Sequence, residues 1–229
     1  MSLIKGLASI KKMQEEAAAK AAERERPKAE WFSSVFPKKT GDTVTVRFLQ
    51  ELDEDMTNYD KTRGAGFIVV EHNAPGPEGF KRRAKCTIDE GECYACERHK
   101  LDYKAGWKQK QNLYINVLME YEGEKKVFVL SRNANSTFVQ ALIQEAIDEG
   151  SITDANYRLT KTGTGTQTQW LLKRLKDGLL DDSGVEVYDL DTVAVRNIEY
   201  DKQAEYYGGV SVNAGSDEGA SSAPADDEW

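Results

Sequence analysis

The sequence predicts a mainly β fold of the α+β class, and three observations lie behind this prediction. Five or six short stretches rich in β-branched residues alternate apolar and polar positions, as strands with one buried face do. One amphipathic segment, 137–149, precedes the last pair of these stretches, and a long stretch with little periodicity, 73–110, follows the second. Such strands, with one helix before the last hairpin, fit a small closed or semi-closed OB-type barrel best; a β-sandwich is the alternative.

Local signals place the individual elements of this core. The turn residues 122–124 join two strands into a hairpin, and residues 163–166 join the last two strands. Ser136 is suited to cap the start of the helix over 137–149, and Gly150 to end it. The expected strands are 42–49, 66–72, 112–121, 126–131, 157–162 and 167–174.

The chain divides into an arm, a core and a tail. Residues 1–28 are expected to form a helical arm, because apolar residues from Leu3 to Met13 recur at helical spacing and Pro27 ends the helix. Residues 29–200 form the core, with the insertion at about 72–110. Residues 201–229 are expected to be a flexible acidic tail, since the composition from Gly208 onward is rich in Gly, Ser, Ala and Asp.

Length and composition limit the classes of protein that are possible. The 229 residues suffice for one good-sized domain with tails, or for two small domains. No stretch approaches the roughly 18–20 apolar residues of a membrane-spanning helix, and the N-terminus lacks the apolar segment of a secretory signal. Three cysteines are an odd number for a disulfide framework. We therefore expect a cytoplasmic protein.

The net charge of -8 conceals an uneven distribution. Residues 201–229 carry a net charge of -6, so the other 200 residues carry only -2. Residues 157–176 contain five bases and no acid, and residues 81–85 form a second basic cluster. A basic run by itself is typical of a solvated surface, but a near-neutral core with local basic patches is compatible with a polyanionic ligand.

The three cysteines form the sharpest motif in the sequence. Cys93 and Cys96 are a CxxC pair that puts two thiolates on one turn, and Cys86 lies just upstream. A structural zinc site needs four tetrahedral ligands, so a histidine must be the fourth. His72 and His99 both have feasible spacings. We favour His72, since it would close the whole insertion into a loop, and we predict one structural Zn²⁺ per chain.

Roles without a structural metal agree less well with the surroundings of these cysteines. Buried free cysteines are at odds with the polar sequence of 86–93. A redox CxxC pair is expected beside a βαβ pattern, and none surrounds this one. A zinc deaminase would need H-x-E and P-C-x-x-C, whereas Asn73 follows His72 and Glu92 precedes Cys93. The chain also shows no catalytic triad, carboxylate pair or phosphate-binding loop, so we expect it not to be an enzyme.

Basic and aromatic residues are interleaved in the insertion and in the last hairpin. Proteins bind single strands with basic grooves that follow the phosphates and with aromatic rings that stack on bases. Any one of these rings, taken singly, is more typical of a protein core. The predicted DNA-binding residues are Lys81, Arg82, Arg83, Lys85, Tyr94, Trp107, Lys108, Lys110, Tyr114, Arg158, Lys161, Trp170 and Lys173.

The order His72, Cys86, Cys93, Cys96 between barrel strands resembles the T-even-type phage single-stranded-DNA-binding (helix-destabilising) proteins. The resemblance covers roughly residues 31–200. It implies an OB barrel with an inserted zinc subdomain held by one histidine and three cysteines, and it favours His72. It also implies that the hairpin 158–170 lines a DNA cleft, and that an N-terminal arm mediates cooperative self-association along DNA.

The acidic C-terminus resembles the aromatic-ended tails of single-strand-binding proteins in general. A flexible polyanion is able to occupy a basic groove when DNA is absent. Trp229, beside its own carboxylate, is suited to dock in a pocket of a replication or recombination protein; the alternative is a plain solubilising tail. The residues expected to bind such partners are Asp226, Asp227, Glu228 and Trp229.

These observations together predict a non-enzymatic protein that binds single-stranded DNA with little sequence preference. It would coat strands in phage DNA replication, recombination and repair, in the cytoplasm of a bacterial host. The alternative is a zinc-stabilised adaptor, a transcription or replication modulator that binds proteins and not DNA.

Overall fold

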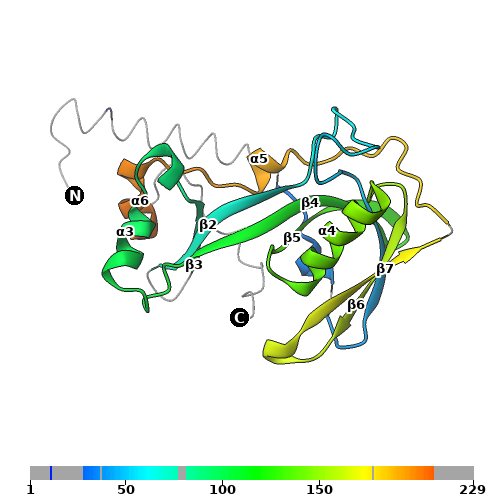
Figure 1. Ribbon diagram of the computed structural model, residues 1–229, viewed down its shortest axis with the longest axis horizontal. Coiled ribbons are helices and arrows are strands. Elements are labelled where there is room, and N and C mark those ends of the chain that lie inside the picture. Colours follow the sequence, from blue (N-terminus) through cyan, green and yellow to red (C-terminus); the bar gives the residue numbers. More distant parts are fainter. Residues whose placement is uncertain (1–10, 12–27, 37, 77–80, 177, 209–229) are drawn as a thin grey trace, which may run out of the picture. The chain divides into compact units, whose positions relative to one another are not determined.

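A computed structural model describes residues 11, 28–36, 38–76, 81–176 and 178–208 (Figure 1). Among them are short helices and two 3-10 turns. The strands are β1 (Thr43–Phe48), β2 (Phe67–Pro75), β3 (Lys81–Lys85), β4 (Gln109–Tyr121), β5 (Glu124–Asn133), β6 (Asn156–Thr162) and β7 (Gln169–Leu175). The helices and turns are α2 (Phe32–Val35), η2 (Ile88–Glu90), α3 (Tyr94–Leu101), α4 (Thr137–Glu149), η3 (Gly165–Gln167), α5 (Leu190–Val193) and α6 (Tyr200–Tyr207).

The strands form one seven-stranded antiparallel sheet, which confirms the predicted mainly β fold. Its order is β3-β2-β4-β1-β6-β7, with β5 paired to β4. The path is not closed within the described residues. The OB-type barrel therefore stays a prediction at this point.

The chain separates into two compact units. The described part of the first unit comprises 11, 28, 70–76, 81–110 and 195–208, and that of the second comprises 29–36, 38–69, 111–176 and 178–194. The first unit contains all three cysteines and both histidines, whereas the second contains most of the sheet.

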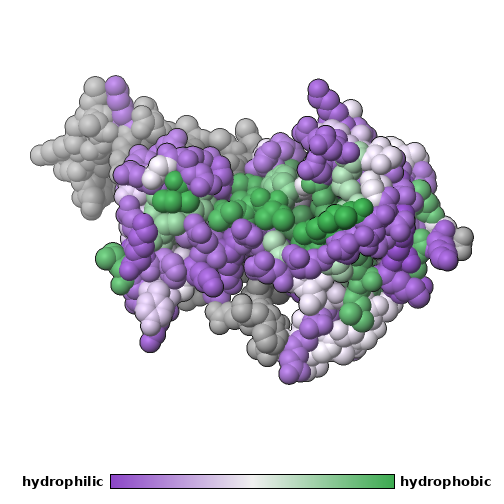
Figure 2. Space-filling view, in the orientation of Figure 1, coloured by the Kyte–Doolittle hydropathy of each residue, from purple (hydrophilic) through white to green (hydrophobic). Residues whose placement is uncertain are grey.

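The second unit has a large apolar core. The strands alternate as predicted: Val46 and Phe48 in β1, and Tyr157 and Leu159 in β6, are buried. α4 packs against β7 and adds Phe138, Val139, Leu142 and Ala146 to the core. The same helix leaves Ile147 exposed, and Figure 2 shows apolar surface over α4.

The predicted ends of α4 are confirmed. The hydroxyl of Ser136 accepts a hydrogen bond from the backbone N–H of Val139, and Gly150 ends the helix with a left-handed φ of 74°. The β4–β5 turn is also as predicted. Glu122 and Gly123 both have positive φ, as a tight two-residue hairpin turn of type I′ requires.

The first unit has more regular structure than the sequence indicated. The insertion, which showed little periodicity, contains the end of β2, all of β3, and α3. Residues 201–207, assigned from composition to the flexible tail, belong to α6 instead. This helix buries Gln203, Tyr206 and Tyr207, and it lies beside α3 (Figure 1). Aromatic burial here outweighs the acidic composition that suggested a tail.

The helical arm proposed for 1–28 and the tail from 209 onward lie almost wholly outside the described residues. Among the residues that are described, no helix combines the length and the apolar character needed to cross a membrane.

Candidate metal centre and candidate nucleic-acid interface

Four side chains of the first unit bring their ligand atoms together. One nitrogen of His72 and the sulfur atoms of Cys86, Cys93 and Cys96 all lie within 4.8 Å of one another. The Sγ atoms of Cys86 and Cys96 are 3.6 Å apart, and Cys96 Sγ is 3.4 Å from His72 Nε2. Sulfurs bound to tetrahedral zinc at about 2.3 Å would be about 3.8 Å apart. The cluster is therefore compatible with a single metal ion such as zinc.

Strand ends and a helix start position the four ligands. His72 lies in β2 opposite Ala84 of β3, and Cys86 directly follows β3. Cys93 is the N-cap residue of α3, and Cys96 lies in its first turn. The N–H groups at a helix start favour negative charge, so this position suits two thiolates.

The ring of His72 is held with one nitrogen free for a metal. Its Nδ1 lies 2.6 Å from the backbone carbonyl of Trp107, which can only accept a hydrogen bond. Nδ1 therefore carries a proton, and Nε2 faces the thiols. Metal-binding histidines generally have such a partner on the second nitrogen, because it fixes the tautomer and the ring orientation.

Gln109 supports the charge of the cluster. Its Nε2 donates to the sulfurs of Cys86 and Cys96 at 3.1 and 3.2 Å. Three thiolates and a divalent ion would carry one net negative charge, which N–H donors stabilise. Sequence reasoning missed this residue, because a glutamine 13 residues from the nearer of these two cysteines has no spacing signature.

Hydrogen bonds and burial shift the thiol pKa values in opposite directions. Burial opposes ionisation of Cys93, but hydrogen bonds from His72 and the backbone of Cys96 outweigh it and lower its pKa to about 6. Burial and the neighbouring thiols raise the pKa of Cys96 to about 12. One thiolate thus forms readily and opposes the next, so full ionisation needs a cation among the sulfurs.

Side chains of α6 hold the segment that contains Cys86, Cys93 and Cys96. The side chain of Gln203 accepts a hydrogen bond from the backbone N–H of Tyr94 and donates to the hydroxyl of Thr87. The rings of Tyr94 and Tyr207 stack with centroids 6.5 Å apart. Residues of α6 that are far away in the chain therefore hold this segment in place.

His99 does not belong to the cluster, so the structure favours His72 over the alternative. His99 lies in the sixth position of α3, and its half-buried side chain has no hydrogen-bond partner for Nδ1 among the described residues.

Three aromatic residues that were predicted to bind DNA are buried in protein cores, which contradicts that role. Trp170 is 4% exposed and packs against Phe32, Phe36 and Phe138. Tyr114 is fully buried. Trp107 is buried too, and its carbonyl orients the ring of His72. These aromatic residues alternate with basic residues along the chain because the aromatic side chains face the core and the basic ones face the solvent.

The remaining residues predicted on the first unit have varied surroundings. Arg83 pairs with the buried carboxylate of Glu71 at 3.1 Å, and Lys85 pairs with Glu90 at 2.9 Å. Arg82 donates to the carbonyl of Tyr206 and lies over its ring. Arg82 and Arg83 therefore contribute to the fold, whereas the exposed pair of Lys85 contributes little to stability. Four more are exposed or half-buried: Lys81, Tyr94, Lys108 and Lys110.

Arg158 and Lys173, in contrast, meet on one exposed sheet face. They are direct cross-strand partners, and Arg158 is also the partner of Thr45 in β1. Lys161 lies on the opposite face, across from Trp170. The face, here called the cationic sheet face, is formed by Thr43, Thr45, Arg47, Arg158, Thr160, Thr162, Gln169, Leu171 and Lys173.

The cationic sheet face contains bases, hydroxyls and an exposed apolar side chain. β1, β6 and β7 contain no acidic residue. Leu171 is 52% exposed on this face, and no local signal distinguishes it from the buried leucines. On the first unit, Tyr103 is 71% exposed with Lys104 beside its ring, and was likewise missed.

Comparisons with models of protein families, with curated proteins and with solved structures found no match for this chain. The assignment of its sites therefore depends on their geometry and chemistry.

Proposed function

We propose that the protein binds single-stranded DNA with little sequence preference and has no catalytic role. It would coat exposed strands during phage DNA replication, recombination and repair, in the cytoplasm of a bacterial host. The observation that carries the proposal is the cationic sheet face, in which Arg158 and Lys173 lie directly opposite each other with no acid on the three strands.

Like charges directly opposite each other destabilise a sheet, so their pairing is a cost to the folded protein. A polyanion at this face would turn that cost into attraction. Threonine hydroxyls and Gln169 supply donors to phosphate oxygens, and Leu171 offers an apolar contact to a base. None of these groups reads base edges in a fixed order, which supports binding of low sequence preference.

The metal centre would be structural. The donor set of one imidazole and three thiolates is typical of structural zinc, and four protein ligands leave no open position for catalysis. We propose one Zn²⁺ per chain. Its role would be to hold the insertion in the shape in which Lys81, Tyr94, Lys108 and Lys110 contribute to strand binding.

The finer features remain proposals supported by the sequence. The ligand order His72, Cys86, Cys93, Cys96 and the mainly β fold support membership of the T-even-type phage single-stranded-DNA-binding family, with an OB-type barrel. The N-terminal arm would mediate cooperative self-association along DNA. The acidic tail ending in Trp229 would bind replication or recombination proteins.

One observation favours the alternative, a zinc-stabilised adaptor that binds proteins. Leu101 and Tyr103 of the first unit are 77% and 71% exposed, which suits a protein contact. If protein at low salt fails to retard an oligo-dT strand, the DNA-binding proposal is wrong and the adaptor takes its place.

The test of the interface is a titration of oligo-dT across a salt series, with tryptophan fluorescence as the readout. Replacing both Arg158 and Lys173 by alanine should weaken binding and reduce the slope of log K against log salt by about 1.4, since each lost phosphate contact on a single strand removes about 0.7. The exchange Arg158→Lys with Lys173→Arg should keep most of the affinity.

The matched control removes the same charge elsewhere. Lys126 and Lys202 each pair with a glutamate at the surface, and changing both to glutamine should leave the salt slope unaltered. An equal loss in the control and in the Arg158/Lys173 variant would show that only net charge matters, and would contradict the proposed interface.

A further inference from the structure

A surface strap, Gly178–Asp182, covers one end of the cationic sheet face. The carbonyl of Leu180 accepts a hydrogen bond from Arg47 of β1 at 2.7 Å. The side chain of Asn156, the cross-strand partner of Arg47, accepts from the N–H of Leu180 at 3.0 Å and donates to the carbonyl of Gly178. These three hydrogen bonds attach residues 178–180 of the strap to two sheet residues.

The strap delivers one carboxylate to two arginines. Oδ1 of Asp182 lies 2.8 Å from Arg47 Nη1, and Oδ2 lies 2.5 Å from Arg63 Nη1. All three side chains line a pocket of about 380 Å³, at the small end of the range for ligand sites. Two guanidinium groups that converge on a pair of oxygens are the arrangement that recognises phosphate as well as carboxylate.

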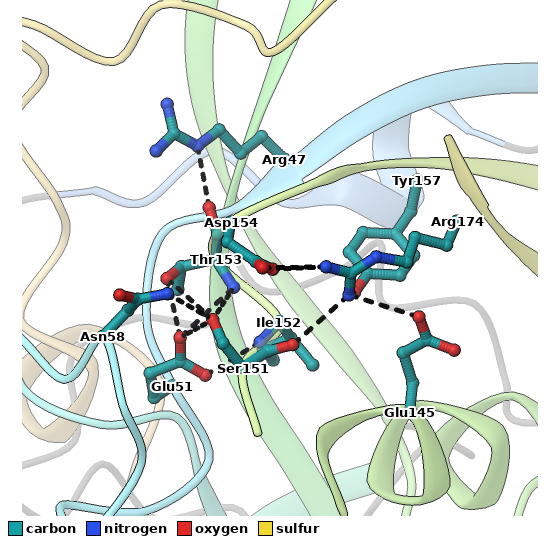
Figure 3. A network of polar contacts seen from close by, with 10 residues as sticks. All are labelled: Arg47, Glu51, Asn58, Glu145, Ser151, Ile152, Thr153, Asp154, Tyr157 and Arg174. Atoms are coloured by element: carbon teal, nitrogen blue, oxygen red, sulfur yellow. Dashed lines mark hydrogen bonds and ion pairs between the residues drawn. The ribbon is translucent and has the colours of Figure 1, made fainter. Parts of the chain in front are cut away.

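Contacts that do not involve the strap also hold Arg47 in this position. Its Nε donates to the carbonyl of Thr153 at 3.1 Å. Figure 3 shows this contact, with the far end of the guanidinium turned away from the network of Glu51, Ser151 and Thr153. The buried carboxylate of Glu51 accepts hydrogen bonds from the hydroxyls of Ser151 and Thr153, both at 2.6 Å, and so fixes that carbonyl. The arginine would therefore stay in place if the strap moved.

The other two acids of the pocket have partners of their own. Both carboxylate oxygens of Asp154 accept from Arg174 at 2.8 Å (Figure 3). Asp60 accepts from the backbone and the hydroxyl of Thr62, and its nearest approach to Arg63 is 3.8 Å. Of the three, only Asp182 is placed where it neutralises Arg47 and Arg63 together.

The strap itself is weakly packed. None of the residues 178–189 is buried, and Leu179 is 48% exposed. Segments with few buried apolar contacts open at low free-energy cost. What holds the strap is therefore polar, and a competing anion would act on those same polar contacts.

We infer that Arg47 and Arg63 form a phosphate subsite at the end of the cationic sheet face, and that Asp182 occupies it as an internal substitute for phosphate until a strand displaces the strap. The inference rests on the proposed function, because the displacing phosphate would belong to single-stranded DNA. It makes the strap an autoinhibitory element that lowers affinity for short or weakly held anions.

The decisive variant is Asp182→Asn, which keeps the shape of the side chain and removes its charge. Freed of their internal counter-ion, the two arginines should bind oligo-dT several-fold more tightly, because the strand no longer has to break the ion pairs of Asp182. Adding Arg63→Gln should abolish the gain. Unchanged or weaker binding of the Asp182→Asn variant would overturn the inference.

Asp181→Asn is the matched control. Asp181 is adjacent in the chain, but its carboxylate is exposed and pairs with Lys125 at 2.8 Å, outside the pocket. The Asp181→Asn variant removes one negative charge from the strap, as Asp182→Asn does. An equal gain in affinity from both variants would reduce the effect to net charge and overturn the subsite.

Two further measurements keep this inference separate from the proposed function. Inorganic phosphate should raise the melting temperature of the Asp182→Asn protein more than that of the Asp181→Asn protein, whether or not either binds DNA; equal shifts would overturn the subsite.

In the wild-type protein, amide exchange at Leu180 should quicken when oligo-dT binds, because the strap leaves Asn156. Slower exchange there would contradict displacement, even if a variant failed to fold. Failure of the wild-type protein to bind oligo-dT would remove the proposed function, while a phosphate response would still identify the subsite.

Discussion

The two units of this protein achieve stability by different means. The core of the second unit is built from large apolar side chains of β1, β4, β5, β6, β7 and α4, with three phenylalanine rings packed against Trp170. The core of the first unit is small, and two of its members, Cys86 and Cys93, belong to the candidate metal centre. A unit with so few apolar residues needs a second source of free energy, and the proposed metal would supply it.

The largest expected effect is the loss of the metal. Chelation or His72→Gln should abolish hydrogen-exchange protection over 81–110 and leave the protection of α4 and β5 intact. Structural zinc contributes about 10–16 kcal/mol in small peptides, far more than the first unit could supply by packing. Residue-resolved exchange with elemental analysis checks this.

His99→Gln is the control for that experiment. It removes an imidazole from the same unit, but one that lies outside the cluster. The metal content should stay at one per chain. Loss of the metal in the His99→Gln protein, or its retention in the His72→Gln protein, would show that the ligand set is wrong.

The next effect belongs to the second unit. Trp170→Ala should lower the free energy of unfolding by about 3–5 kcal/mol, because it leaves a cavity among three phenylalanines. Leu171→Ala, on the exposed face of the same strand, should cost about 0.5 kcal/mol or less. Urea unfolding measures both. If the first variant also lost its metal, the two units would not be independent in stability.

A third, smaller effect tests the surroundings of the metal. Gln109→Ala removes the donor shared by Cys86 and Cys96, and should weaken metal binding about tenfold, the lower end for such partners because Gln109 is exposed. Competition with a chromogenic chelator gives the affinity. Lys108→Ala, an exposed neighbour, should leave it unchanged; an equal change in both would assign the effect to the loop as a whole.

The features that the sequence predicts are those set by local signals, and the features that it misses are those set by tertiary contacts. Ser136 and Gly150 predicted both ends of α4, because helix caps are local signals. The choice between His72 and His99 stayed open on spacing alone, and the β2–β3 register decides it by placing His72 opposite Ala84, two residues before Cys86. Gln203 and Tyr207 escaped notice, since an acidic, glycine-flanked segment gives no sign that tertiary contacts will fold it.

The predicted DNA contacts divide in the same way. Side chains alternate along a strand, so Tyr157 and Arg158 must lie on opposite sides of β6, and in the structure Tyr157 is buried and Arg158 is exposed. Parity does not say which side faces the core. Trp170 was therefore grouped with the bases, although its cross-strand partner, Lys161, lies on the face opposite Arg158. The pairing of Arg158 with Lys173 needed the register between two strands, and that register depends on a turn whose length is not evident from its residues.

The smallest expected effect, on the N-cap of α4, tests whether the two units respond differently to single substitutions. Ser136→Ala removes the N-cap hydrogen bond of α4 and should cost about 1 kcal/mol in urea unfolding, whereas Ser136→Asp should retain the cap. The second unit would then lose stability in small, separate steps, because many contacts share its core. The first unit should have no such graded response, since each ligand is required for the whole metal site. Graded loss of the metal across single ligand variants, or global unfolding from the cap variant, would contradict that distinction.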